Sequence, residues 1–135
     1  MIFIDADAFI GLCVPTDAHY KKSAFLFEKL KKEAADVVTS WDVISEVATK
    51  LSRFATKQIA LKFLDLIKEI DIRLEFVDQD SAQEIINLFI KQTSKRVSLT
   101  DCANMAIAKK LGVRLFLSFD EHYVQNGFRL FGTEG

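Results

Sequence analysis

Apolar positions along the chain follow two different spacings. Short, continuous apolar runs, which are typical of buried strands, predict strands at residues 2–4, 36–40, 74–77 and 114–118, with an edge strand at 130–131. Apolar residues at helical spacing fill the segments between them. The predicted helices cover residues 9–14, 16–33, 42–53, 56–70, 80–93, 100–111 and 120–124. Because helices and strands alternate, we predict an α/β fold: a three-layer α/β/α sandwich with a mostly parallel central sheet.

Hydroxyl and carboxylate side chains mark where several of these helices begin. Thr16 is predicted to cap the second helix, and Ser40 or Asp42 to cap the third. Ser118 and Glu121 have the spacing of a capping box before the last helix. The apolar face predicted for the third helix consists of Trp41, Ile44, Val47, Ala48 and Leu51. That face is expected to pack on the sheet.

The bulk composition describes one domain, residues 1–135, long enough to bury a full core. One Pro and five Gly leave no long flexible linker. The formal net charge of −1 argues against a protein that coats nucleic acid passively, which is expected to be strongly basic. Cys13 and Cys102 lie in apolar surroundings and are expected to be free thiols, and no Cys/His cluster suggests zinc.

No segment of the sequence looks like a membrane or export signal. No apolar run approaches the roughly 18–20 residues needed to cross a bilayer. The start of the chain lacks a basic region and reaches an acid at Asp5, too early for a signal peptide. We therefore expect a cytoplasmic protein.

Four acids stand where their local segments end or turn. Asp5 follows the apolar residues 1–4, and Asp120 follows residues 115–119, while Glu46 and Asp101 lie in predicted helices. The carboxyl ends of strands are where an open α/β sheet places its ligands. Carboxylates that meet there repel one another unless they share a cation, and Mg²⁺ prefers such oxygen ligands. The pattern therefore points to metal-dependent phosphoryl or phosphodiester chemistry.

Each acid also has a local explanation. Asp5 or Asp7 is suited to cap the first helix, and Asp101 favours the dipole at the start of its own. Glu46 lies nearly opposite Ile44 and Leu51 around its helix, which favours a solvent-facing side chain. The joint arrangement, more than any single acid, indicates a functional site.

Four segments together resemble the motifs of PIN-domain nucleases, in the family's order. The segment 2–10 resembles the opening strand that ends in Asp, and 39–47 resembles the helix that carries a Glu. The segment 98–108 is similar to the third motif, an Asp opening a helix of small residues. The segment 117–123 resembles the fourth, a hydroxyl residue, any residue, then Asp and an aromatic. The length also fits the small prokaryotic branch, the VapC-type toxins of toxin–antitoxin pairs.

This resemblance implies a metal-dependent endoribonuclease. It implies that Asp5, Glu46, Asp101 and Asp120 are catalytic and bind one or two Mg²⁺ or Mn²⁺ ions. It also implies that Ser118, Asn104 and Asp7 support them, by orienting carboxylates or water. The chain has no Gly-rich phosphate loop, so a nucleotide-binding P-loop is not indicated.

Three basic residues are candidates for contacts with the substrate, and the two histidines are not. Lys50, Arg53 and Lys57 lie on or after the Glu46 helix and are predicted to contact the RNA backbone. A metal-free ribonuclease needs two imidazoles as acid and base. The two histidines are instead expected apart, His19 on an exposed helix and His122 near the rim of the site.

Three other functions fit part of the pattern. Asp5-Ala6-Asp7 mimics the acid pair of haloacid dehalogenase-type phosphatases, although that family expects Thr or Val where this chain has Phe9. A catalytically silent binding module would use the acids as caps and surface groups. A PIN nuclease of RNA maturation, without an antitoxin, has the same motifs as a toxin.

The predicted partners are RNA, a second copy of the chain and an antitoxin, with no membrane. The apolar residues Phe54, Ile59, Phe63 and Ile67 exceed what one sheet face should cover, which predicts a homodimer. An antitoxin is expected to bind an apolar groove and to reach the acids with an Arg.

Overall fold

The computed structural model describes residues 1–133; the last two residues of the predicted domain, 134–135, lie outside the described part. Its sheet has strands β1 (Ile2–Ile4), β2 (Val37–Ser40), β3 (Ile72–Glu75), β4 (Leu115–Leu117) and β5 (Arg129–Leu130). The strand order is β3-β2-β1-β4-β5 and every neighbouring pair is parallel. This confirms the predicted α/β class.

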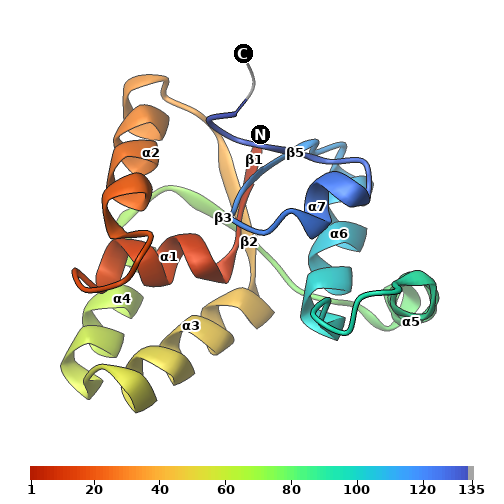
Figure 1. Ribbon diagram of the computed structural model, residues 1–135, viewed down its shortest axis with the longest axis horizontal. Helices are drawn as coiled ribbons and strands as arrows, with labels where there is room; N and C mark the ends of the chain where they lie inside the picture. Colours follow the sequence, from red (N-terminus) through yellow and green to blue (C-terminus); the bar gives the residue numbers. More distant parts are fainter. Residues whose placement is uncertain (134–135) are drawn as a thin grey trace.

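Helices cover both faces of the sheet. They are α1 (Ala6–Cys13), α2 (Tyr20–Lys32), α3 (Trp41–Phe54), α4 (Lys57–Glu69), α5 (Ala82–Lys91), α6 (Leu99–Leu111) and α7 (His122–Gln125), with a 3₁₀ turn, η1 (Gln79–Ser81), before α5. Figure 1 shows α1 to α4 on one side of the strands and α5 to α7 on the other, which gives the three predicted layers. Among residues 1–133, no helix is long and apolar enough to cross a membrane.

The order of the strands reverses between β1 and β4. The chain runs outward from β1 to β2 and β3, then returns to β4 on the other side of β1. Phe3 pairs with Phe116 across this junction, and their fully buried rings stack with centroids 4.9 Å apart. In open α/β sheets, ligands bind at the carboxyl ends of the strands at such a reversal. The acids that follow β1 and β4 are therefore in the position expected for a ligand site.

Several element boundaries differ from the sequence prediction, and the first helix begins at Ala6 instead of residue 9. The second helix begins at Tyr20, and Thr16 is not its cap. The Asp17 carboxylate accepts a hydrogen bond from the His19 backbone N–H at 2.8 Å, so a turn occupies the residues before the helix. The third strand is shifted to residues 72–75, because pairing with β2 ends at Ser40 opposite Glu75. The apolar residues Phe76 and Val77 lie beyond this pairing and are exposed.

Two further predictions about side chains are corrected. Trp41 is 49 % exposed and not on the buried face of α3; its ring packs against Phe76, with centroids 6.0 Å apart. The capping box predicted at the last helix does not form, because the Ser118 hydroxyl accepts from the Asp120 N–H instead. Ser40 caps α3 as predicted, accepting from the Val43 N–H at 3.1 Å. Cys13 and Cys102 are free thiols, as predicted.

Candidate functional site

Asp5 is a buried carboxylate at the end of β1, only 5 % exposed. It is the N-cap of α1, where its Oδ1 accepts from the Ala6 N–H at 2.8 Å. The alternative prediction, that Asp7 caps this helix, is thus wrong. Oδ2 accepts from the Tyr123 hydroxyl at 2.8 Å, and the Asn104 amide lies 3.4 Å from Oδ1. The capping explanation is therefore correct for Asp5 but incomplete, because two further helices, α7 and α6, supply polar groups to the same carboxylate.

Asp7 lies in the first turn of α1 and faces the end of β4. Its Oδ2 accepts from the Phe119 backbone N–H at 2.8 Å and from the Ser118 hydroxyl at 3.1 Å. Its Oδ1 is buried and has no hydrogen-bond partner among the described residues. A buried carboxylate oxygen without a donor is costly, so this atom indicates a missing positive group.

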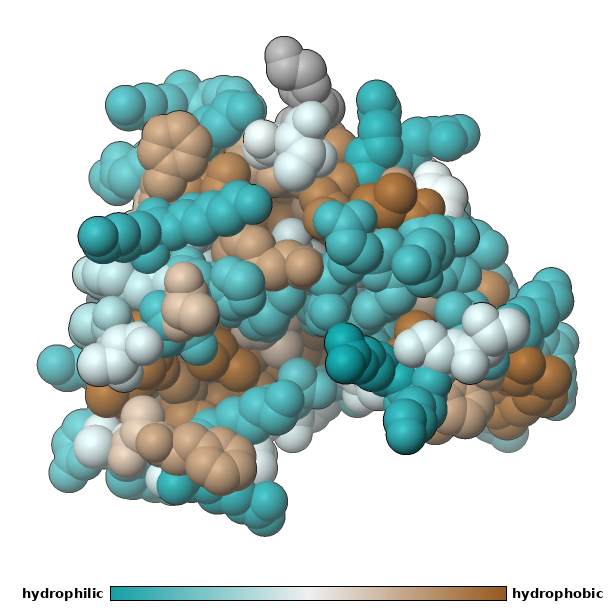
Figure 2. Space-filling view, in the orientation of Figure 1, coloured by the Kyte–Doolittle hydropathy of each residue, from teal (hydrophilic) through white to brown (hydrophobic). Residues whose placement is uncertain are grey.

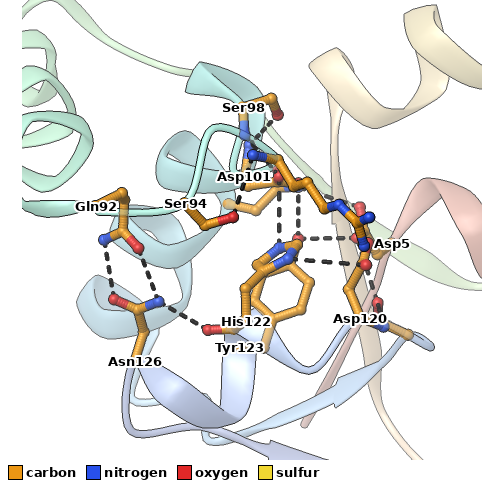
Figure 3. Close-up of polar contacts among 12 residues, drawn as sticks. Asp5, Gln92, Ser94, Ser98, Asp101, Asp120, His122, Tyr123 and Asn126 are labelled. Atoms are coloured by element: carbon orange, nitrogen blue, oxygen red, sulfur yellow. Dashed lines mark hydrogen bonds and ion pairs between the residues drawn. The ribbon is translucent and has the colours of Figure 1, made fainter.

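Asp101 closes a capping box at the start of α6. Its Oδ2 accepts from the Ser98 N–H at 2.8 Å, and the Ser98 hydroxyl accepts from the Asp101 N–H at 3.0 Å. The other oxygen, Oδ1, lies 3.3 Å from the Tyr123 hydroxyl. That hydroxyl therefore stands between Asp5 and Asp101, as Figure 3 shows. A phenol carries one proton, so it can donate to only one of the two carboxylates at a time.

His122 lies deeper in the site than the sequence predicted. It was expected near the rim, but it is 9 % exposed and lies between two acids. Its Nε2 is 3.4 Å from Asp101 Oδ2, and its Nδ1 is 3.8 Å from Asp120 Oδ1 (Figure 3). The sequence signal was present in the fourth motif: His122 and Tyr123 are the second and third residues after Asp120, on the first turn of α7.

Asn104 links the Asp5 carboxylate to the second strand. Fully buried on α6, it receives a hydrogen bond from the Ser40 hydroxyl at its Oδ1, 2.8 Å away. Its amide points to Asp5 Oδ1. The amide orientation is thus set by Ser40, which leaves the NH₂ group as the donor toward Asp5.

Asp5, Asp7 and Asp101 line one cavity of about 370 Å³ at the carboxyl ends of β1 and β4. Its lining includes all four acids of the sequence prediction, together with Asp7 and the basic residues Lys50 and Arg96. Glu46 therefore reaches this cavity, although its helix position suggested solvent. It is tied to Lys50, whose ammonium lies 3.4 Å from Glu46 Oε2.

The three residues predicted to contact RNA differ in their relation to the cavity. Lys50 lines it, and Arg53 lines a neighbouring depression that shares Glu46 and Lys50 with it. Lys57, the first residue of α4, lines neither.

Burial and neighbouring charges shift the pKa values of several groups in the site. Burial, with added repulsion from Asp7 and Asp101, raises the pKa of Asp5 to about 8. Burial and the charge of Asp120 raise the pKa of Asp7 to about 6, against hydrogen bonds that lower it. Burial lowers the pKa of His122, but Asp101, Asp120 and Asp5 outweigh it, so its pKa is raised. Conversely, burial of Asp101 is outweighed by His122 and Ser98, and its pKa is lowered.

Three of the acids converge closely enough to share one ion. Asp5, Asp7 and Asp120 each offer a carboxylate oxygen, and these atoms all lie within 4.8 Å of one another. The sequence had placed Asp101 at the centre and Asp7 in support; in the structure Asp7 belongs to the close group, while Asp101 lies across the Tyr123 hydroxyl. The fold is thus an α/β protein in which carboxylates gather at the reversal of a parallel sheet, the usual ligand position of such sheets.

Comparison with known proteins gives the family. The model of the PIN domain matches residues 2–128, so the chain belongs to the PIN domain family. The fold is similar to the crystal structure of Mycobacterium tuberculosis VapC20, which is described as a sarcin-ricin loop cleaving toxin. The two share 22 % identity with a TM-score of 0.83, over 95 % of this chain and 96 % of that one. No curated protein matches the chain significantly.

Proposed function

We propose that this PIN-domain protein is a metal-dependent endoribonuclease that hydrolyses RNA phosphodiester bonds, and that it is the toxin of a toxin–antitoxin pair. The observation that carries the proposal is the convergence of Asp5, Asp7 and Asp120 within 4.8 Å at the reversal of the sheet. The likeness to VapC20, a toxin that cleaves the sarcin-ricin loop, supports the choice of RNA.

The residues at the site fit a Mg²⁺ or Mn²⁺ ion. The donors are carboxylate oxygens, which these hard cations prefer, and no soft sulfur ligand lines the cavity. The orphaned Oδ1 of Asp7 is open to a positive partner, and a cation would offset the burial and the repulsion between acids that raise the pKa values of Asp5 and Asp7. Asp5, Asp7 and Asp120 are assigned as ligands, with Asp101 and Glu46 as further carboxylates on the cavity wall.

The chain's own groups have separate tasks. When bound, the cation supplies a water of lowered pKa and stabilises charge on the attacked phosphate. Tyr123 and Asn104 fix the two oxygens of Asp5, and Ser118 with the Phe119 N–H fixes Asp7. Such supporting donors keep carboxylates aimed at the ion.

His122 lies between Asp120, one of the three converging acids, and Asp101, which is outside that group. Its two ring nitrogens lie 3.4 Å from Asp101 and 3.8 Å from Asp120, so a protonated ring stabilises both carboxylates. Its own position follows from the neighbouring Tyr123, whose ring stacks on Phe116 of β4 with centroids 4.1 Å apart. The core of the sheet thereby sets the spacing of the carboxylates.

Basic side chains at the cavity supply contacts for the RNA backbone. Lys50 and Arg96 line the cavity itself, and Arg53 continues the path along α3. Cations flanking an acidic centre hold the phosphates on either side of the cleaved bond. Lys57, outside this path, is assigned at most to a more distant phosphate.

The competing functions are weakened to different degrees. A silent binding module does not need three carboxylates that converge around a buried Asp5, and the phosphatase alternative loses its basis because the matching family model is the PIN domain. A PIN nuclease of RNA maturation shares every feature of the site. The reading frame beside this gene separates the two: a short frame encoding a DNA-binding antitoxin supports the toxin.

We further propose a cytoplasmic homodimer that an antitoxin inhibits by placing an Arg among the acids. The excess of carboxylates over basic groups in the cavity favours such a ligand. Co-expression with the neighbouring reading frame should give a stable complex without nuclease activity. Failure to form any complex removes the antitoxin from the proposal.

The nuclease itself is tested with a mixed RNA pool, in Mn²⁺ and in EDTA. We expect cleavage by the native chain in Mn²⁺ only, and none by Asp5→Asn or Asp101→Asn. Asp71→Asn is the matched control, because Asp71 is exposed and precedes β3, away from the cavity. Cleavage that survives EDTA or Asp101→Asn contradicts the metal nuclease.

A further inference from the structure

We propose that His19 and Phe119 form a stacking platform for one base of single-stranded RNA at the mouth of the acidic cavity. The inference rests on the proposed nuclease function and specifies how its substrate is held. The two rings stack with centroids 4.2 Å apart and planes 12° from parallel. His19 is exposed and lines the cavity that contains Asp5, Asp7 and Asp120.

The position of Phe119 ties the platform to the acids. Its backbone N–H donates to Asp7 Oδ2 at 2.8 Å, and it stands between Ser118 and Asp120 in the chain. Its side chain is half-buried against the core. The backbone contact and the packing of the ring keep Phe119 close to the acids, so a base stacked on the pair lies near a phosphate held at the acids.

Backbone hydrogen bonds hold His19 in position, so its ring is not needed to anchor this segment. Its N–H donates to Asp17 at 2.8 Å, and its carbonyl accepts from the Ser23 N–H at 2.8 Å. Gly11 allows this close approach, since a Cβ there would lie 3.3 Å from the His19 carbonyl and 2.5 Å from the Ser23 hydroxyl. The segment before α2 is thus held firmly against α1.

Capping of α2 does not explain why residue 19 is a histidine. His19 is the N-cap residue of α2, yet its side chain makes no capping hydrogen bond. Ser, Thr, Asp or Asn is preferred at this position because a short oxygen side chain satisfies the first N–H groups. The His19 ring makes no capping hydrogen bond and stacks on Phe119 instead. This exposed ring provides a flat surface at the site.

The chemistry of this surface suits an unpaired base. Bases of single-stranded RNA are recognised largely by stacking on aromatic side chains, histidine included, and such stacking tolerates any base. The exposed Lys22 places its Nζ over the Phe119 ring, 5.6 Å from the ring centre, so it adds positive charge to the platform while the base stacks on the His19 ring. A base on the rings and its phosphate near Lys22 describe one nucleotide subsite.

The test compares RNA with and without bases. The probes are fluorescein-labelled single strands of roughly twelve nucleotides, within the range of single-strand binding sites: oligo(A), oligo(U) and a ribose-phosphate strand lacking bases. Binding is measured by anisotropy in Ca²⁺ buffer, with gels to verify that the strands stay intact. The variants are His19→Ala, which removes the ring, and His19→Phe, which keeps a stacking surface.

We expect His19→Ala to weaken binding of the two base-bearing strands by about five- to tenfold, in line with the loss of one stacked base. Binding of the base-free strand should change less than about twofold, since it depends on phosphate contacts. His19→Phe should restore the preference for bases. Phe25→Ala is the matched control, because Phe25 is another exposed aromatic of α2 that does not line the cavity.

Two results overturn the platform. One is unchanged binding of oligo(A) and oligo(U) by His19→Ala. The other is an equal loss for strands with and without bases, which would indicate a change in backbone contacts or in folding. Cleavage of the RNA pool in Mn²⁺ is measured separately. If the protein prefers base-bearing strands through His19 but never cleaves RNA, the nuclease proposal is refuted and the platform stands. If it cleaves RNA without that preference, the platform is refuted and the nuclease proposal stands.

Discussion

The carboxylate of Asp7 accepts a hydrogen bond from the backbone N–H of Phe119 at 2.8 Å, across 112 residues of sequence. This contact joins the first turn of α1 to the segment after β4 and brings Asp7 beside Asp120. It leaves the other Asp7 oxygen buried and unpaired among the described residues. Asp7 is therefore arranged as a ligand would be, and not as a surface acid.

Asp7→Asn tests this assignment. If Asp7 binds the ion directly, cleavage should fall by more than the roughly 10–100-fold that is usual for groups that only support a ligand. The amide NH₂ would also face a site meant for a cation. Rates in Mn²⁺ should be compared with those of Ser118→Ala, which removes a supporting hydroxyl from the same carboxylate. Similar losses for the two variants would return Asp7 to a supporting role.

Tyr123→Phe removes the hydroxyl between Asp5 and Asp101 and leaves the ring in place. Because the ring stacks on Phe116 in the core, we expect the fold to persist. Cleavage and Mn²⁺ affinity should each fall by about 10–100-fold, as the Asp5 carboxylate loses its 2.8 Å donor. Isothermal titration with Mn²⁺ and cleavage rates provide the measurements. A normal Mn²⁺ affinity in this variant would show that the hydroxyl does not position Asp5.

The sequence predicted the sheet better than the detail of the site. Apolar runs predicted β1, β2 and β4 because buried parallel strands need them, whereas β3, which is only partly buried, lies two residues before the predicted 74–77. Asp5 was found because it directly follows β1. The fourth motif contains His122 and Tyr123, but no role was predicted for either, because nothing local separates an aromatic on a four-residue helix from a core residue. Their role depends on contacts with Asp5 and Asp101, far away in the chain.

Glu46 shows what helical periodicity cannot predict. Helical periodicity placed it on the solvent side of α3, and its side chain is indeed a third exposed. The cavity nevertheless includes it, because α3 begins directly at the carboxyl end of β2. Periodicity reports the direction from the helix axis, and it carries no information on whether a cleft lies in that direction.

Among the predicted catalytic acids, Glu46→Gln should cost the least activity. Glu46 already has a cationic partner in Lys50, 3.4 Å away, and lies outside the group of oxygens within 4.8 Å. We expect a loss smaller than that of Asp5→Asn, measured as kcat/KM on one RNA in Mn²⁺. Lys50→Met is the companion variant, since it removes the partner. Equal losses for Glu46→Gln and Asp5→Asn would make Glu46 a full ligand.

The homodimer prediction now has a specific surface. Of the residues that suggested it, Phe63 is buried, whereas Phe54 is 84 % exposed. Exposed apolar side chains gather on α5, at Ile86, Phe89 and Ile90, where Figure 2 shows a hydrophobic area. Ile90→Glu should convert the dimer to a monomer in light scattering at tens of micromolar, and Phe25→Glu on α2 should not. A native protein that is monomeric at that concentration contradicts the dimer.

The stability of the metal-free protein should fall as the pH rises from about 5 to about 8. The pKa of Asp5, raised from 3.8 to about 8, and that of Asp7, raised to about 6, mean that the folded state holds more protons than the unfolded chain in this window. The free energy of unfolding therefore decreases with pH there. The raised pKa of His122 acts in the same direction, and the lowered pKa of Asp101 affects only more acidic solutions. A loss of about 2 kcal/mol lowers the melting temperature by roughly 5–10 °C.

Mn²⁺ should cancel this loss, because a bound cation replaces the missing protons and stabilises the folded state by mass action. Melting curves in EDTA and in millimolar Mn²⁺, at pH 5 and pH 8, give the four values required. Asp5→Asn should melt higher than the native chain in EDTA at pH 8 and gain less from Mn²⁺. Asp71→Asn, which leaves the cavity unchanged, should follow the native chain throughout. A native protein that is equally stable at both pH values in EDTA would show that its acids do not repel one another enough to require a cation.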